Sequence, residues 1–186
     1  MRPYHTLSPE EAYEVARERI AEAKRTGATV LDLHDLALAA LPPELGDLEA
    51  LEVLALGNSR PLKGGGWEFD VASTMKTFSS LEPVARLARL RALDASGCSG
   101  VTTLSPLSGL TGLQSLNVSW CTGVTTLSPL SGLTGLQSLV MSVCTGVTTL
   151  SPLSGLTGLQ SLNVSWCTGV TTLSPLSGLT GLQTLY

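Results

Sequence analysis

Apolar and polar side chains alternate over short stretches that recur at a fixed interval along the chain. Within residues 113–121, Leu116 and Val118 alternate with polar side chains, and this period of two predicts a short strand with one buried face. Leucines that occupy the same place in successive units are Leu31, Leu54, Leu93, Leu116, Leu139, Leu162 and Leu185. The pattern therefore predicts about seven coils, each contributing one strand.

One unit, LSPLSGLTGLQSLNVSWCTGVTT, spans 104–126 and returns, with three changes in the first copy, at 127–149 and 150–172. We expect Ser105 and its equivalents to cap a short helical turn that has proline at its first position. Burial of the few apolar side chains in one coil cannot offset the entropy lost in ordering it, so neighbouring coils must stack into a parallel sheet.

The two ends and one interruption complete the expected organisation. Ser8-Pro9-Glu10-Glu11 has the form of a capping box, which predicts a capping helix within 1–27 ahead of a repeat domain at 28–186. A longer interval between two of the leucines indicates an insertion near 57–80. The last coil is incomplete and ends at Tyr186 within an expected strand. Because unpaired strand edges promote association, we expect a homodimer formed through this uncapped coil.

The spacing LxxLxxLxLxxC, carried by Leu110, Leu113, Leu116, Val118 and Cys121, resembles the leucine-rich repeat, with Cys where many families have Asn. The resemblance covers roughly residues 28–186. It implies an α/β solenoid, a right-handed coil with a parallel concave β-sheet, short helical or 3-10 convex segments and an N-terminal capping helix. The leading repeats resemble those of bacterial signalling proteins such as Roco-type GTPases, and SPLSGLTGLQSL resembles internalin-type repeats.

Composition narrows the possible functions. The net charge is −4, and no charged side chain follows Asp94. A surface without cations cannot neutralise phosphates, so we expect no nucleic-acid partner for the second half. There is no apolar stretch long enough to cross a bilayer and no signal-peptide pattern at the start, so we expect no membrane partner and a cytoplasmic location.

Residues that could carry catalytic or metal chemistry are few and badly spaced for it. Cys98, Cys121, Cys144 and Cys167 occupy the same place in successive coils, so they form a column instead of surrounding one ion, and we expect four buried free thiols. His34 lies beside two aspartates, where we expect a solvated surface residue. The stretch KGGGWEF lacks the phosphate-loop pattern. We therefore expect no enzyme, no cofactor and no metal.

The remaining candidate function is recognition. We expect the polar alternates of each strand to face outward on the concave sheet, with a tryptophan at its rim. In the middle copy, the Asn and Trp of the repeat are replaced by Val, which predicts an apolar notch between two tryptophans. The candidate residues are Asn117, Ser119, Trp120, Val140, Ser142, Val143, Asn163, Ser165 and Trp166. Alternatively, the tryptophans are a repeat consensus that packs over its own loop.

The insertion offers a second patch, Trp67 and Phe69, because aromatic and charged loops often contact partners. Alternatively, these two rings fold back and cover the widened edge of the solenoid. Together the observations favour a non-catalytic module that binds a protein partner on the concave face. Two other functions stay open: the recognition arm of a larger bacterial effector or signalling enzyme (GTPase or ligase type), and an ice-binding or self-associating solenoid suggested by the recurring Thr pairs.

Overall fold

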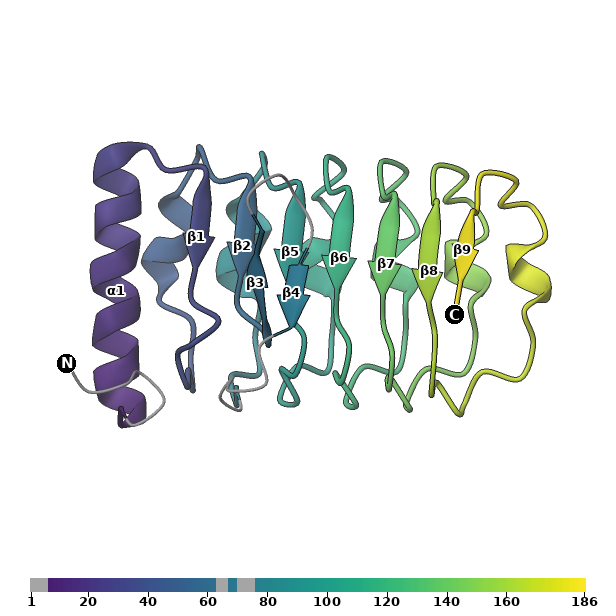
Figure 1. Ribbon diagram of the computed structural model, residues 1–186, viewed down its shortest axis with the longest axis horizontal. Coiled ribbons are helices and arrows are strands. Elements are labelled where there is room, and N and C mark those ends of the chain that lie inside the picture. Colours follow the sequence, from purple (N-terminus) through teal and green to yellow (C-terminus); the bar gives the residue numbers. More distant parts are fainter. Residues whose placement is uncertain (1–6, 63–66, 70–75) are drawn as a thin grey trace.

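The computed structural model describes residues 7–62, 67–69 and 76–186. Seven short parallel strands form one sheet (Figure 1). Short 3-10 segments lie behind this sheet along its length. In the order of the sheet, the strands are β1 (Val30–Asp32), β2 (Val53–Ala55), β5 (Ala92–Asp94), β6 (Ser115–Asn117), β7 (Ser138–Val140), β8 (Ser161–Asn163) and β9 (Thr184–Leu185). The 3-10 segments are Pro43–Asp47, Glu82–Arg86, Ser105–Leu107, Ser128–Leu130, Ser151–Leu153 and Ser174–Leu176. The sheet has an open face on the side away from these segments.

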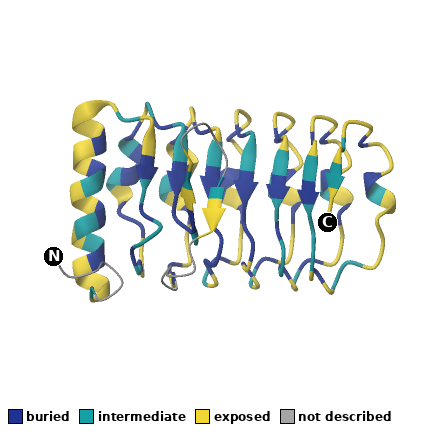
Figure 2. Cartoon of the chain, viewed as in Figure 1, coloured by how far each residue is buried: buried dark blue, intermediate teal, exposed yellow. Residues whose placement is uncertain are grey.

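The register of the sheet follows the leucines of the repeat. Leu31 pairs with Leu54, and the pairing continues coil by coil until Leu162 pairs with Leu185. In the inner coils these leucines are fully buried, together with those of the 3-10 segments, and they form one continuous core (Figure 2). The predicted period of two and the predicted register are therefore confirmed, and the parallel stacking explains why a single coil needs its neighbours.

A helix covers the first coil, as the capping-box pattern predicts. Helix α1 (Pro9–Thr26) begins after Ser8, whose hydroxyl accepts from the Glu11 backbone N–H while the Glu11 carboxylate accepts from the Ser8 N–H. It ends at Gly27, which has a left-handed backbone (φ 65°). The apolar face of the helix, with Ile20 at its centre, joins the core of the repeats.

The short 3-10 turns are capped differently from the expectation. Ser105 is the first residue of its turn and Pro106 the second, and no serine side chain caps the turn. Instead, the Thr103 hydroxyl accepts from the Ser105 backbone N–H at 3.1 Å and also bonds to the Ser105 hydroxyl. The same Thr–Ser arrangement recurs in the next three coils. The prediction of serine caps was wrong because the turn begins at Ser105 itself and Leu104 holds the capping position, so the serine N–H needs an acceptor, which threonine two residues earlier provides.

The four cysteines lie buried in a column as free thiols, as the sequence predicts. Each of Cys121, Cys144 and Cys167 donates its S–H to a backbone carbonyl of the preceding coil, at 3.0 to 3.3 Å. Burial raises the pKa of Cys121 and of Cys144 to about 12, and that of Cys98 well above its ordinary value. Thiolates, which are the reactive form, are therefore scarce at neutral pH.

We expect the native chain to react little with Ellman's reagent at pH 8, because its thiols are both protonated and shielded. After unfolding in guanidinium chloride, four thiols per chain should react. Absorbance at saturation gives both counts. An intact mass lowered by the hydrogens of one or two disulfides, or rapid reaction of the folded chain, would contradict this arrangement.

Candidate partner-binding surface

The open face of the sheet displays the side chains that alternate with the buried leucines. Since Leu116 points into the core, Asn117 points to the other side of β6. The register places Asn117 beside Asp94 on β5 and Val140 on β7, and places Val140 beside Asn163 on β8. The valine of the deviant repeat thus lies between two asparagines on this face, half-buried.

Two of the residues expected to be exposed on this face are buried. Asn117 accepts from the Ser119 backbone N–H at 3.1 Å, and both residues are shielded from solvent. The equivalent pair, Asn163 and Ser165, makes the same bond at 2.9 Å but is only partly buried, as is Ser142. Trp67 of the insertion reaches Ser115 on the same strand as Asn117, and we attribute the difference to this contact. The prediction that Asn117 and Ser119 are exposed was therefore wrong.

Trp120, Val143 and Trp166 occupy the same tight turn after their strands. All three have left-handed backbones, with φ of 64°, 62° and 61°. The preceding coil has Gly97 at this place, with φ 71°. Turns that require positive φ favour glycine or asparagine, and a β-branched residue such as Val143 is an outlier there. The sequence predicted that these side chains lie at the rim, but not that their backbones are left-handed. The alignment of Trp120 with Gly97, one repeat earlier, was the available signal.

Main-chain bonds hold these turns in step with the sheet. Trp120 N donates to Ser142 O at 2.8 Å, and Val143 N donates to Ser165 O at 2.9 Å. Successive turns are therefore about 4.8 Å apart, which places the two indole-bearing residues about 10 Å from each other. Trp120 is 54% exposed and Trp166 is 77% exposed, while Val143 between them is half-buried. We call the surface formed by Trp120, Val143 and Trp166 the tryptophan notch.

We expect Val143→Asn to stabilise the chain by about 1 kcal/mol, because asparagine tolerates a left-handed backbone that valine adopts with strain. Urea unfolding followed by circular dichroism measures the change. Gly97→Val is the mirror control: it introduces the same strain, and a Cβ there would lie 2.2 Å from Asn58 Nδ2, so it should destabilise the chain. A loss of stability in Val143→Asn would show that the turn is not strained.

The insertion forms a hairpin on the open face of the sheet. Strands β3 (Ser59–Pro61) and β4 (Trp67–Phe69) pair in antiparallel fashion and lie in front of β2 and β5 in Figure 1. Trp67 Nε1 donates to the Ser115 hydroxyl at 3.3 Å, and Arg60 pairs with Glu68. Trp67 therefore packs down onto the sheet, whereas Phe69 is 61% exposed. The two aromatic side chains that the sequence grouped as one patch thus have different surroundings.

A buried polar group that the sequence analysis missed anchors this insertion. Asp94 is fully buried, and its carboxylate accepts from the backbone N–H of Ser59 at 2.9 Å and of Ser96 at 3.3 Å. The Ser96 hydroxyl accepts from the Asn58 N–H at 2.9 Å. Burial raises the pKa of Asp94 to about 6, against the lowering effect of these hydrogen bonds. Asp94 aligns with the asparagine of the later repeats, which was the available signal.

A second buried charge joins the insertion to the first coil. Lys76 is fully buried, its ammonium donates to the His34 carbonyl, and burial lowers its pKa to about 8. The His34 ring lies against Asp32, with 2.6 Å between Nδ1 and Oδ1, and its side chain is largely buried. The prediction of a solvated surface histidine was therefore wrong, because the His34 ring packs against Asp32 and its carbonyl is bound by Lys76. Arg19 of helix α1 binds Asp35 through two hydrogen bonds of 2.7 and 2.9 Å.

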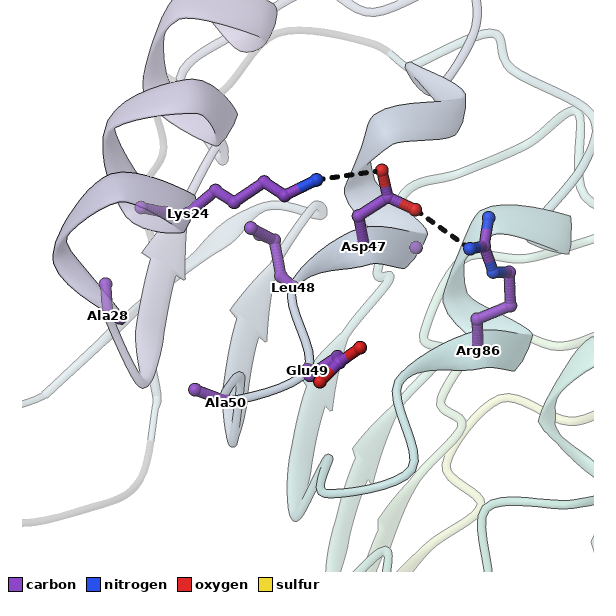
Figure 3. A pocket seen from close by; sticks show the side chains of 10 residues that line it. Lys24, Ala28, Asp47, Leu48, Glu49, Ala50 and Arg86 are labelled. Carbon is purple, nitrogen blue, oxygen red and sulfur yellow. Dashed lines mark hydrogen bonds and ion pairs between the residues drawn. The ribbon is translucent and has the colours of Figure 1, made fainter.

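A hollow of 690 Å³ lies at the other side of the molecule, between the end of α1 and the first 3-10 segments (Figure 3). Asp47 lies between two cations there, accepting from Lys24 at 3.1 Å and from Arg86 at 2.8 Å. These ion pairs are exposed and contribute little to stability. The Asp47 carboxylate already pairs with both cations. We therefore regard the hollow as the place where helix α1 packs against the first coils.

Within the described part of the chain, no group of three or more His, Cys, Asp or Glu residues could hold a metal ion. Among the same residues, no helix combines the length and the apolar character that crossing a membrane requires.

Comparison with known proteins bears on the fold. A scan against protein-family models and a search of curated proteins found no match to this sequence. Among solved structures, the chain is similar to an internalin, inlF, of Listeria monocytogenes, with a TM-score of 0.56 and 22% identity over 89% of this chain and 49% of that one. It is also similar to the leucine-rich repeat domain of the type III effector XopL, with a TM-score of 0.51 and 14% identity over 99% of this chain and 89% of that one.

A plant peptide hormone receptor, RGFR1, in complex with RGF2, gives a TM-score of 0.63 and 17% identity over 88% of this chain and 25% of that one. The chain thus spans about half the length of the internalin and a quarter of the receptor. At such identities the likeness concerns the fold alone. Together with the leucine register and the stacked coils, it shows that the chain is a leucine-rich-repeat solenoid.

Proposed function

We propose that the chain is a non-catalytic protein-interaction module that binds a segment of a partner protein at the tryptophan notch. The observation that carries the proposal is a pair of largely exposed indoles held on left-handed backbones. Bulky residues at positive φ lower stability, and such strain persists mainly at functional sites. Tryptophan is also among the residues that contribute most to binding energy when a partner covers it.

The notch has the shape of a binding site because of its middle residue. A third tryptophan at position 143 would continue a uniform ridge, but Val143 is smaller and leaves space between its two neighbours. At the end of β7, the strand that leads into this turn, Val140 replaces the polar Asn of the other copies. An apolar floor between two aromatic walls suits an apolar side chain of a partner. The buried Asn117 and Ser119 lie outside this site, and Trp67 belongs to the hairpin.

A second proposal concerns the setting of the module. The alternative is that the chain is the recognition arm of a larger bacterial effector or signalling enzyme of the GTPase or ligase type. The internalin is about twice as long as this chain, and the XopL domain is one part of an effector. We propose such an arm as the alternative function. The buried free thiols are compatible with a reducing compartment, and on that basis we propose a cytoplasmic location.

Selection from a displayed library of random 12-residue peptides tests the binding function. The original chain is the bait, and each selected peptide is then measured against Trp166→Ala and against Trp67→Phe as a matched control outside the notch. The proposal predicts peptides that lose binding to Trp166→Ala and keep it with Trp67→Phe. If every selected peptide binds Trp166→Ala as well as the original chain, the notch is not the binding site.

A further inference from the structure

The tryptophan notch imposes a distance on any partner that runs along the solenoid. Trp120 and Trp166 occupy identical places two coils apart, and the main-chain bonds between turns keep those coils in step. Two strand spacings amount to about 9.6 Å. A partner segment lying across the strands therefore meets two indoles about 9.6 Å apart, with the shorter Val143 halfway between them.

Of the regular backbone conformations, polyproline II comes closest to this repeat. It has three residues per turn and a rise of about 3.1 Å, which gives about 9.3 Å per turn. An extended strand returns a side chain to the same face about every 6.7 Å. Two turns of an α-helix span about 10.8 Å. Polyproline II thus matches two strand spacings more closely than the helix does, whose two turns are about 1 Å longer.

The charge of the surface points to the same class of partner. The coils around the notch carry no charged side chain, since none follows Asp94 in the sequence. A charged partner side chain that lost its water there would find no counter-ion. The complementary partner segment is therefore itself uncharged. Proline rings are apolar and neutral, and grooves lined by aromatic side chains are the surfaces that recognise proline-rich segments.

Hydrogen-bonding capacity is matched as well. Polyproline II has no internal hydrogen bonds, so its carbonyls are available as acceptors, and proline has no N–H that needs an acceptor. The notch and its surroundings provide donors: the indole N–H of each tryptophan, and the side-chain amide of the half-buried Asn163 at the end of β8, the strand that leads to Trp166. A segment that mainly accepts thus faces a surface that can donate.

We infer that the tryptophan notch binds an uncharged, proline-rich segment in the polyproline II conformation, running across the strands so that successive turns contact Trp120 and Trp166. The inference rests on the proposed function and specifies its partner. Because polyproline II is already ordered before binding, such a segment loses little conformational entropy when it docks.

Fluorescence anisotropy of labelled peptides tests this inference with the full chain. The probes are a 12-residue polyproline and a 12-residue alternating Gly-Ser peptide of equal charge. We expect the polyproline to bind at least tenfold more tightly than the Gly-Ser peptide. Trp166→Ala and Val143→Trp should each weaken polyproline binding at least tenfold, whereas Trp67→Phe should leave it unchanged.

The outcomes separate this inference from the function on which it rests. If the polyproline binds no better than the Gly-Ser peptide, or binds Trp166→Ala equally well, the inference fails. If it fails while library-selected peptides still depend on Trp166, the notch is a binding site for another class of segment and the proposed function stands. If selected peptides are also indifferent to Trp166, both fail.

Discussion

Trp166→Ala should bind peptides selected on the original chain at least about 30-fold more weakly, which corresponds to about 2 kcal/mol. Trp166 is the most exposed tryptophan, so its ring contributes little to the folded state and much to a covered interface. Alanine keeps a Cβ on the left-handed backbone, so the strain at this turn is largely retained. Unfolding stability should therefore change by less than about 0.5 kcal/mol.

Trp120→Ala provides the companion measurement, because Trp120 forms the opposite wall of the notch. It should weaken the same peptides, and the double variant should lose no less than either single one. Calorimetric titration gives the affinities and urea unfolding gives the stabilities. A large loss of stability with unchanged affinity would mean that the indoles serve the repeat by covering their own loops, which is the alternative that the sequence left open.

The free energy of unfolding of the original chain, measured relative to that of Asp94→Asn, should fall by up to about 3 kcal/mol as the pH rises from 4 to 6. Burial raises the pKa of Asp94 to about 6, so the folded state favours its neutral form. The contribution of this group is therefore full below the ordinary aspartate pKa near 4, and it is lost as the pH approaches 6. Lys76 does not titrate in this interval, since its pKa is about 8.

The comparison between the original chain and Asp94→Asn isolates the titration of Asp94. Other carboxylates, such as Asp47 with its pKa lowered by the hydrogen bond from Lys24, titrate equally in both and cancel in the difference. Asparagine cannot titrate, although it also changes the bond with the Ser59 N–H, so the readout is the slope with pH and not the absolute stability. Parallel stability curves from pH 4 to 6 would contradict a raised pKa for Asp94.

The sequence was sufficient for the parts of the fold that depend on repetition. A leucine every 23 residues sets the register because each coil must bury the same side of its strand, as the pairing of Leu116 with Leu139 shows. The capping helix was equally predictable, since Ser8, Glu11 and Gly27 act through neighbours in sequence. Both features follow from local chemistry repeated at a fixed interval.

Long-range contacts of the insertion account for the wrong predictions about His34 and Asn117, whereas the wrong prediction of serine caps has a local cause. Nothing local indicates that Trp67 reaches Ser115, 48 residues away in the sequence, or that Lys76 binds the carbonyl of His34, 42 residues earlier. The burial of Asn117 has the same origin, because its repeat sequence is identical to that of the more exposed Asn163. Repetition predicts equal environments, and a single insertion removes that equality.

The candidate site was predictable in position but not in backbone conformation. The replacement of Trp by Val143 was visible in the alignment of repeats, and so was the rim position. The positive φ of this residue depends on a turn whose geometry is set by bonds to the next coil, including Val143 N to Ser165 O. The strain that supports a functional reading therefore became evident only in the structure.

The most direct test of the tryptophan notch is the affinity of one selected peptide for the chain in which the repeat consensus is restored, Val140→Asn with Val143→Trp. This variant fills the space between Trp120 and Trp166 while keeping every wall residue. The account predicts that it folds with a cooperative unfolding transition like that of the original chain and that its binding is abolished. Equal affinity for the restored and original chains would contradict the account, because the deviant repeat would then contribute nothing to recognition.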